Sequence, residues 1–137
     1  MQFEVTILGC SGAIPAYDRR TTSHFLNYNG HGFLIDCGEG TQMQMARHNI
    51  RRAKLDHVFI SHLHGDHFFG LMGLISSFNL NYREAPLHIY GNEGIEEIVR
   101  AHFKHAQTVL RYPIEFHVVQ PDTPAIIFEN SFLTVES

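Results

Sequence analysis

Four side chains that bind metal ions lie within six residues, at positions 62 to 67. The run reads HLHGDH and supplies three imidazoles and one carboxylate, from His62, His64, Asp66 and His67. Imidazole together with carboxylate suits zinc, and manganese or iron can be held by the same groups. Two divalent ions about 3.5–4 Å apart can clamp the attacking and leaving oxygens of a phosphoryl transfer. The run therefore predicts a metal-dependent hydrolytic site, whereas a histidine-rich turn without a metal is the plain alternative.

The segments on either side of this run are expected to hold it in place. Residues 58–61 are apolar and prone to form a strand, and residues 68–75 can open a helix. Because residues two apart on a strand point the same way, His62 and His64 are expected to converge on one ion. Asp66 and His67 lie on the turn beyond and are expected to face a second ion. Regular elements on both sides would fix these side chains.

The hydrophobic pattern of the whole chain predicts an α/β fold. The early strands come as hairpins, which favours a mixed sheet over a fully parallel one. Asn29 and Gly30 predict a tight hairpin turn, Thr41 a helix cap, and Asn130 a turn between the last two strands. The expected strands are 3–9, 23–28, 32–36, 56–60, 87–90, 114–119, 125–128 and 131–136, and the expected helices are 41–48, 68–80 and 92–105.

Length and composition indicate one globular domain or a piece of one, with 137 residues of which 44% are apolar. No apolar run approaches the roughly 18 residues of a membrane span, and no signal peptide is visible at the start. Cys10 and Cys37 are too few for a disulfide scaffold, so a reducing cytoplasm is expected, with both thiols buried.

Charge gives no overall attraction to nucleic acid, because the net charge is −4. Two local basic clusters could contact phosphates: residues 47–54, and the pair Arg19 and Arg20. From charge alone, a solvated helix end and a polar loop are the better interpretations.

Three motifs, taken in order, resemble the tRNase Z family of the metallo-β-lactamase superfamily. Residues 7–15 read ILGCSGAIP, residues 33–42 read FLIDCGEGTQ, and residues 60–67 read ISHLHGDH before two Gly-Leu pairs. The order and spacing match that family, and three motifs are much more specific than the metal motif alone. The resemblance covers the whole chain as the amino-terminal half of the family.

That resemblance implies a fold and an activity. Residues 1–137 would form the amino-terminal part of a single metallo-β-lactamase-like αβ/βα sandwich, a mixed sheet with flanking helices, cut where the chain stops in a strand. The complete protein would be a cytoplasmic, metal-dependent endoribonuclease that removes the 3′ trailer from precursor tRNA and leaves a 3′-hydroxyl. It would carry two zinc ions per active site, with Mn²⁺ or another divalent ion possible, and would act as a homodimer. This part alone is expected to be inactive.

The resemblance also assigns roles to individual residues. His62 and His64 would bind one zinc ion, and Asp66 and His67 the other. Asp66 would in addition be catalytic, orienting or deprotonating the attacking water. Asp36 would support the metal-binding histidines by hydrogen bonding, although an ordinary turn carboxylate is the alternative.

The chain departs from the family pattern in two respects. The family often carries Pro-x-Lys-x-Arg-Asn after the first motif, but residues 15–20 read PAYDRR, with Tyr17 at the lysine position. Arg19 matches the arginine and Arg20 replaces the asparagine, and both are candidate RNA contacts. The downstream ligands and general acid of the family cannot be placed. The other histidines are expected to be structural or exposed, and these are His24, His31, His57, His88, His102, His105 and His117.

Two further functions stay open from the sequence. The same metal centre would serve a related hydrolase acting on small phosphodiesters, sulfate esters or lactones. A fragment with two ligands per ion could also be a non-catalytic metal-binding segment, because a zinc site normally has three or four protein ligands.

Overall fold

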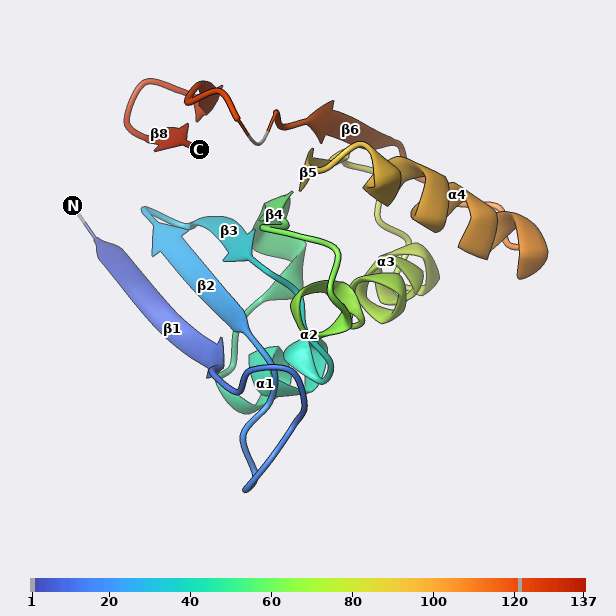
Figure 1. The fold of residues 1–137 in the computed structure, drawn as a ribbon, viewed down its shortest axis with the longest axis horizontal. Coiled ribbons are helices and arrows are strands. Elements are labelled where there is room, and N and C mark those ends of the chain that lie inside the picture. The colour runs from blue at the N-terminus through green and yellow to red at the C-terminus, as the bar shows by residue number, and fades with distance from the viewer. Residues whose placement is uncertain (1, 121) are drawn as a thin grey trace.

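A six-stranded sheet with helices on one face forms most of the structure, a computed structural model that describes residues 2–120 and 122–137 (Figure 1). The strands of the main sheet are β1 (Phe3–Gly9), β2 (Ser23–Tyr28), β3 (His31–Ile35), β4 (Leu55–Phe59), β5 (Leu87–Gly91) and β6 (Ile114–Val118). A separate hairpin comprises β7 (Ile126–Glu129) and β8 (Thr134–Glu136). The helices are α1 (Thr41–Arg47), α2 (Gly65–Phe68), α3 (Leu71–Leu80) and α4 (Gly94–His105), with a 3₁₀ turn, η1 (Arg52–Lys54).

The main sheet is mixed, as the hairpin pattern predicts. Its strand order follows the sequence from β1 to β6. β1, β2 and β3 pair antiparallel, whereas β3, β4, β5 and β6 pair parallel, with helical connections between them. The β2–β3 turn uses Asn29 and Gly30 with φ values of 48° and 89°, the left-handed pair that a two-residue hairpin requires.

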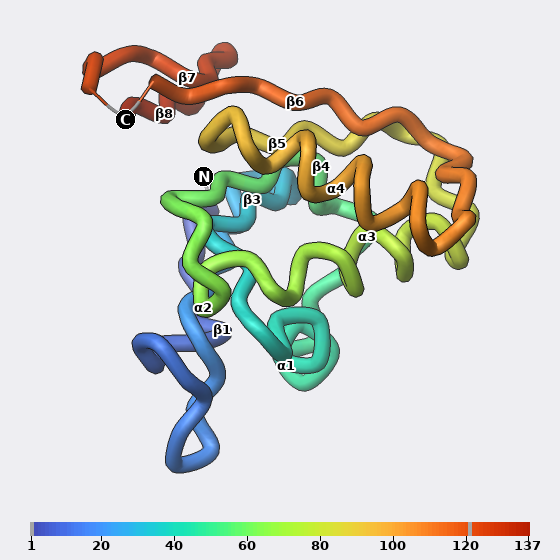
Figure 2. The backbone as a smooth tube through the Cα atoms, turned by 45° about the vertical axis from the view of Figure 1, so that its right-hand side comes forward, coloured from blue at the N-terminus to red at the C-terminus, as the bar shows by residue number. Residues whose placement is uncertain are grey.

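Two apolar clusters lie on opposite faces of this sheet. The helix-side cluster joins strand residues such as Leu34 and Ile89 to Met45 of α1, Leu74 of α3 and Val99 of α4. The other cluster packs the sheet against the β7–β8 hairpin and is centred on four buried aromatic residues, Tyr28, Phe33, Phe59 and Tyr90. Figure 2 shows α1 and α3 on one side of the strands and the hairpin on the other. The turn that carries the metal-binding motif, residues 62–67, follows the end of β4.

Two helix predictions need correction. Thr41 does not cap α1, because its hydroxyl donates to the Gly38 carbonyl at 2.7 Å and no side-chain cap bond is formed. The single helix expected over 68–80 is two helices, α2 and α3. The break occurs because the Gly70 N–H donates to the Cys37 carbonyl at 2.9 Å, which withdraws it from the helical ladder.

The cysteine prediction holds for one residue only. Cys37 is fully buried, and burial raises the pKa of its thiol to about 12. Cys10 is exposed, because it follows the last residue of β1 at the start of a surface loop. Among the described residues, no helix is long and apolar enough to cross a membrane.

A row of aromatic and imidazole rings crosses the hairpin-side face of the sheet. His57 of β4 stacks on His88 of β5 with ring centroids 4.9 Å apart, and on Phe33 of β3 at 5.3 Å. Burial, followed by the nearby charge of His88, lowers the pKa of His57 to about 4. Burial likewise lowers the pKa of His117. The His57 ring therefore stays neutral in the folded chain at mildly acidic pH.

His57 makes stability depend on pH in a defined window. Between pH 6.5 and about 4 the unfolded chain binds a proton at His57 that the folded chain does not, so stability falls as pH falls. Replacing His57 with Phe removes that loss, and the variant should gain about 1 kcal/mol relative to the parent over this window after allowance for solvent screening. Urea denaturation at several pH values measures the difference. His105→Gln, at an exposed site, should show the same pH dependence of stability as the parent. If the stability of H57F falls with pH as steeply as that of the parent, the lowered pKa of His57 is not the cause.

Gly70 tests the close contact that separates α2 from α3. A Cβ atom there would lie 2.2 Å from the Gly38 carbonyl oxygen, and a backbone atom cannot move aside cheaply. Gly70→Ala should therefore lower the free energy of unfolding by about 1–3 kcal/mol. The matched control is Gly12→Ala, where nothing lies within 4 Å of the added atom. Equal stabilities of the two variants by urea denaturation would show that the contact is unimportant.

Candidate metal centre

The four motif side chains lie where β4 passes through a short loop into α2. His62 and His64 are exposed on the loop, and Asp66 and His67 are half-buried in the single turn of α2. The ring centroids of His62 and His64 are 4.8 Å apart. Those of His62 and His67 are only 3.7 Å apart, because α2 folds back towards the end of β4. The structure thus places the three imidazole rings in one group at the end of β4.

Asp36 organises this group from the end of β3. It is 5% exposed, and its φ of 58° turns the chain sharply after the strand. Its Oδ1 accepts the Ser61 N–H at 2.8 Å, and its Oδ2 accepts the Ser61 hydroxyl at 2.9 Å and the His67 Nδ1–H at 2.7 Å. One carboxylate therefore fixes both the loop before the motif and the imidazole at its end.

The hydrogen bond from His67 determines which nitrogen of that ring is left for a ligand. A carboxylate can only accept, so Nδ1 carries the proton and the lone pair lies on Nε2. Nε2 is 3.3 Å from Asp66 Oδ2. Two ligand atoms held about 2.0–2.2 Å from one ion lie about 3.0–3.5 Å apart, so this pair fits a divalent cation.

Asp66 is held by a loop that is distant in sequence. Its Oδ2 accepts the Ala13 N–H at 2.9 Å. That hydrogen bond is the largest cause that lowers the pKa of Asp66, and the neighbouring His67 and His62 add to it. Asp66 is therefore a carboxylate at neutral pH, the form that binds metal ions or orients water.

Backbone contacts join the second sequence motif to the third directly. The Cys37 N–H donates to the His67 carbonyl at 2.7 Å, and the Asp36 N–H donates to the Phe59 carbonyl at 2.7 Å. Gly38 lies so close to Thr21 and Asp66 that an added Cβ would be 2.5 Å from the Asp66 carbonyl oxygen. Gly38 is thus needed for the close approach of chain segments around the site.

The candidate RNA contacts lie on the loop between β1 and β2, which projects away from the sheet (Figure 1). At its tip, Tyr17 and Asp18 form a two-residue turn with φ values of 51° and 62°, closed by hydrogen bonds between Ala16 and Arg19. Arg19 is exposed, whereas Arg20 is half-buried with its side chain against Gly40. The same loop supplies Ala13 to Asp66, so it borders the candidate metal centre.

The sequence analysis missed a second group of metal-binding side chains. In the described part of the chain, the one set of three such residues whose donor atoms lie within 4.8 Å of one another is His88, Glu115 and His117. The motif at 62–67 does not meet that spacing. Glu115 and His117 are two apart on β6, a signal for a shared face, but only the pairing of β6 with β5 places His88 beside them.

Comparison with known proteins agrees with the fold and the motifs. The family model described as Anti-Pycsar protein Apyc1 matches residues 3–110. Ribonuclease Z of Bacteroides fragilis is 42% identical over 134 residues, which cover 98% of this chain but 44% of that protein. The chain therefore spans less than half the length of this curated relative.

Solved structures with a similar fold include a tRNase Z and a metallo-β-lactamase fold protein. The short form of human tRNase Z superposes with a TM-score of 0.88 at 29% identity, covering 98% of this chain and 59% of that one. A metallo-β-lactamase fold protein from Bacillus subtilis gives a TM-score of 0.67 at 25% identity, covering 98% and 56%. The chain therefore belongs to the family described as Anti-Pycsar protein Apyc1, and it shares the metallo-β-lactamase fold with the tRNase Z and ribonuclease Z proteins to which it is similar.

Proposed function

We propose that this chain carries half of the metal centre of an endoribonuclease that removes the 3′ trailer from precursor tRNA. The observation that supports this most strongly is the hydrogen-bonded pair of Asp36 and His67, which leaves Nε2 of His67 facing the Asp66 carboxylate. The similarity to ribonuclease Z and to the short form of human tRNase Z supports RNA, and tRNA in particular, as the substrate class. Because the chain covers 44% of that relative, the remaining ligands and the acid for the leaving group would come from elsewhere in the full-length protein.

The proposed ligands are His62 and His64 for one ion and Asp66 and His67 for the other. Zn²⁺ is the proposed ion, two per site, with Mn²⁺ as a possible substitute. A bound divalent cation would lower the pKa of water and offset the negative charge that develops on the phosphoryl oxygens.

The chain's own residues have distinct parts in this proposal. Asp36 holds the His67 ring in the tautomer that presents Nε2, a supporting role common around metal-binding histidines. Asp66, ionised and fixed by the Ala13 N–H, orients the attacking water towards phosphorus. Water adds to phosphorus and the bond to the 3′-oxygen breaks, which leaves a 3′-hydroxyl on the tRNA and a 5′-phosphate on the trailer. Its lowered pKa suits Asp66 to orientation more than to storing a proton.

The loop of residues 10–22 is the proposed RNA-facing element. Arg19 is exposed near its tip, and Arg20 lies at its base beside the second motif. Arginine binds phosphate through a planar fork of donors, so both are suited to the backbone of a tRNA end.

We further propose that the full-length protein is a homodimer, which sedimentation of that protein would test.

A second candidate stays within the same chemistry. The matching family model is described as an anti-Pycsar protein rather than as a tRNA nuclease. A hydrolase of small phosphodiesters therefore stays as the alternative, because the same ligands would serve a smaller substrate.

One assay separates the two candidates. The protein in its natural full length is incubated with Zn²⁺ or Mn²⁺ and either a 3′-labelled precursor tRNA or bis(p-nitrophenyl) phosphate. We expect site-specific trailer removal, and His64→Ala should reduce it by at least about 100-fold, since even residues that only support metal ligands cost 10–100-fold. His64 is exposed, so folding should be unchanged, and His105→Ala is the matched control. Turnover of the small ester with intact precursor tRNA would replace the first candidate by the second.

Asp36→Asn tests the supporting role directly. Asparagine tolerates a left-handed backbone, so the turn should survive, but its amide cannot accept from both Ser61 and His67 as the carboxylate does. The metal concentration that gives half-maximal hydrolysis should rise about 10–100-fold. Asp18→Asn, at another left-handed position, controls for the backbone. An unchanged metal requirement for D36N would remove Asp36 from the proposed site.

A further inference from the structure

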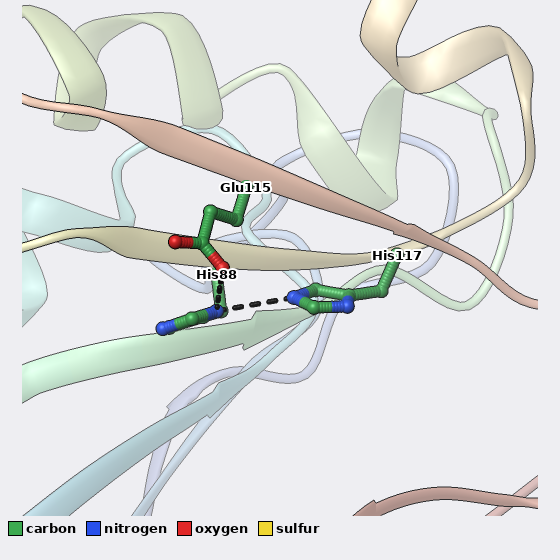
Figure 3. Close-up of side chains that lie close together, drawn as sticks. All are labelled: His88, Glu115 and His117. Atoms are coloured by element: carbon green, nitrogen blue, oxygen red, sulfur yellow. Dashed lines mark hydrogen bonds and ion pairs between the residues drawn. The ribbon is translucent and has the colours of Figure 1, made fainter.

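A second group of metal-binding side chains lies on strands β5 and β6 of the main sheet. Nδ1 of His88 is 3.0 Å from Nε2 of His117 and 3.3 Å from Oε2 of Glu115 (Figure 3). The figure shows the Glu115 carboxylate and the His117 ring both directed towards the His88 ring. None of them belongs to the three sequence motifs.

The register of the two strands builds this group. β5 and β6 are parallel, and His88 is paired with Glu115 while Tyr90 is paired with His117. Because residues two apart share a face, Glu115 and His117 both point to the side on which His88 and Tyr90 lie. The three ligands are therefore fixed by a hydrogen-bonded sheet rather than by a loop.

Stacking holds both imidazoles in orientation. The His117 ring lies on Tyr90 with centroids 4.4 Å apart and planes 11° apart. The His88 ring lies on His57 at 4.9 Å and 16°. His57 in turn has Nδ1 3.2 Å from the Tyr90 hydroxyl, so its own nitrogen is engaged elsewhere. Rings fixed in this way lose little freedom when they bind a ligand.

The donor set and spacing both suit a divalent transition metal. Two imidazoles and one carboxylate are the protein ligands of many zinc sites in which water or a substrate takes the fourth position. Ligand atoms around such an ion lie about 3.0–3.5 Å apart, and the observed separations are 3.0 and 3.3 Å. The carboxylate of Glu115 is about half exposed, which leaves a path for the ion from solvent.

We propose that His88, Glu115 and His117 form a second divalent-cation site, for Zn²⁺ in the first place, separate from the turn at 62–67. An ion there would join β6, the last strand of the main sheet, to β5 through side chains as well as backbone. The site would thus act on the stability of the sheet edge, and it does not depend on the proposed function.

Cobalt binding to the full chain tests the proposal. His62→Gln, His64→Gln and Asp66→Asn together remove three of the four candidate ligands at the turn. His62 and His64 are exposed, and an asparagine in place of Asp66 can still accept from the Ala13 N–H, so the fold should be kept. In this background we expect one Co²⁺ per chain by equilibrium dialysis, with the visible absorption of a low-coordinate site. Adding Glu115→Gln or His88→Gln should weaken that binding by about 100-fold or more, since a lost ligand costs at least as much as a lost supporting residue. His102→Gln, at an exposed site on α4, should leave it unchanged.

A thermal measurement keeps the test decisive if His88→Gln disturbs the sheet. Saturating Zn²⁺ should raise the unfolding midpoint of this triple variant, because a ligand that binds only the folded state stabilises it. The same addition should have little effect once the largely exposed Glu115 is replaced by Gln. A background variant that binds no Co²⁺, or an E115Q variant that binds it as tightly as its parent, would overturn the proposal.

Discussion

The Asp36 carboxylate is the interaction on which the site depends. It accepts three hydrogen bonds, two from Ser61 and one from His67, and so ties the end of β3 to both ends of the motif turn. A buried carboxylate is costly unless its oxygens are paired, and here each oxygen has a donor. The same contacts that satisfy Asp36 fix the tautomer of His67. The hydrogen bonds that stabilise this turn therefore also set the orientation of the His67 ring.

Around that carboxylate, three loops approach one another at backbone distance. Gly38 packs against Thr21 and Asp66, and Gly70 packs against Gly38. The loop that bears the two arginines reaches Asp66 through the Ala13 N–H. Consequently the loop that bears the proposed substrate contacts and the proposed metal ligand Asp66 belong to one hydrogen-bonded assembly. The sheet supplies the fixed ends of these loops, and the glycines permit their approach.

Much of this could be predicted from sequence, because the relevant signals are local. Strand alternation and the Asn29 turn indicated a mixed sheet, and the spacing of the motifs indicated the family. The failures have non-local causes. The helix expected over 68–80 is interrupted because the Gly70 N–H bonds to Cys37, a residue more than thirty positions earlier. The group at His88, Glu115 and His117 needs the β5–β6 register, which a single chain pattern does not encode.

The left-handed backbone at Asp36 has a consequence for how this sequence can vary. Its φ of 58° favours glycine, asparagine and aspartate over most other side chains. Of these three, aspartate alone can accept from a serine and a histidine on both oxygens at once. The backbone conformation thus narrows the choice of residue at this position, and the hydrogen bonds to Ser61 and His67 select aspartate from that set. We therefore expect related sequences to differ in the surrounding loops while they keep aspartate at position 36.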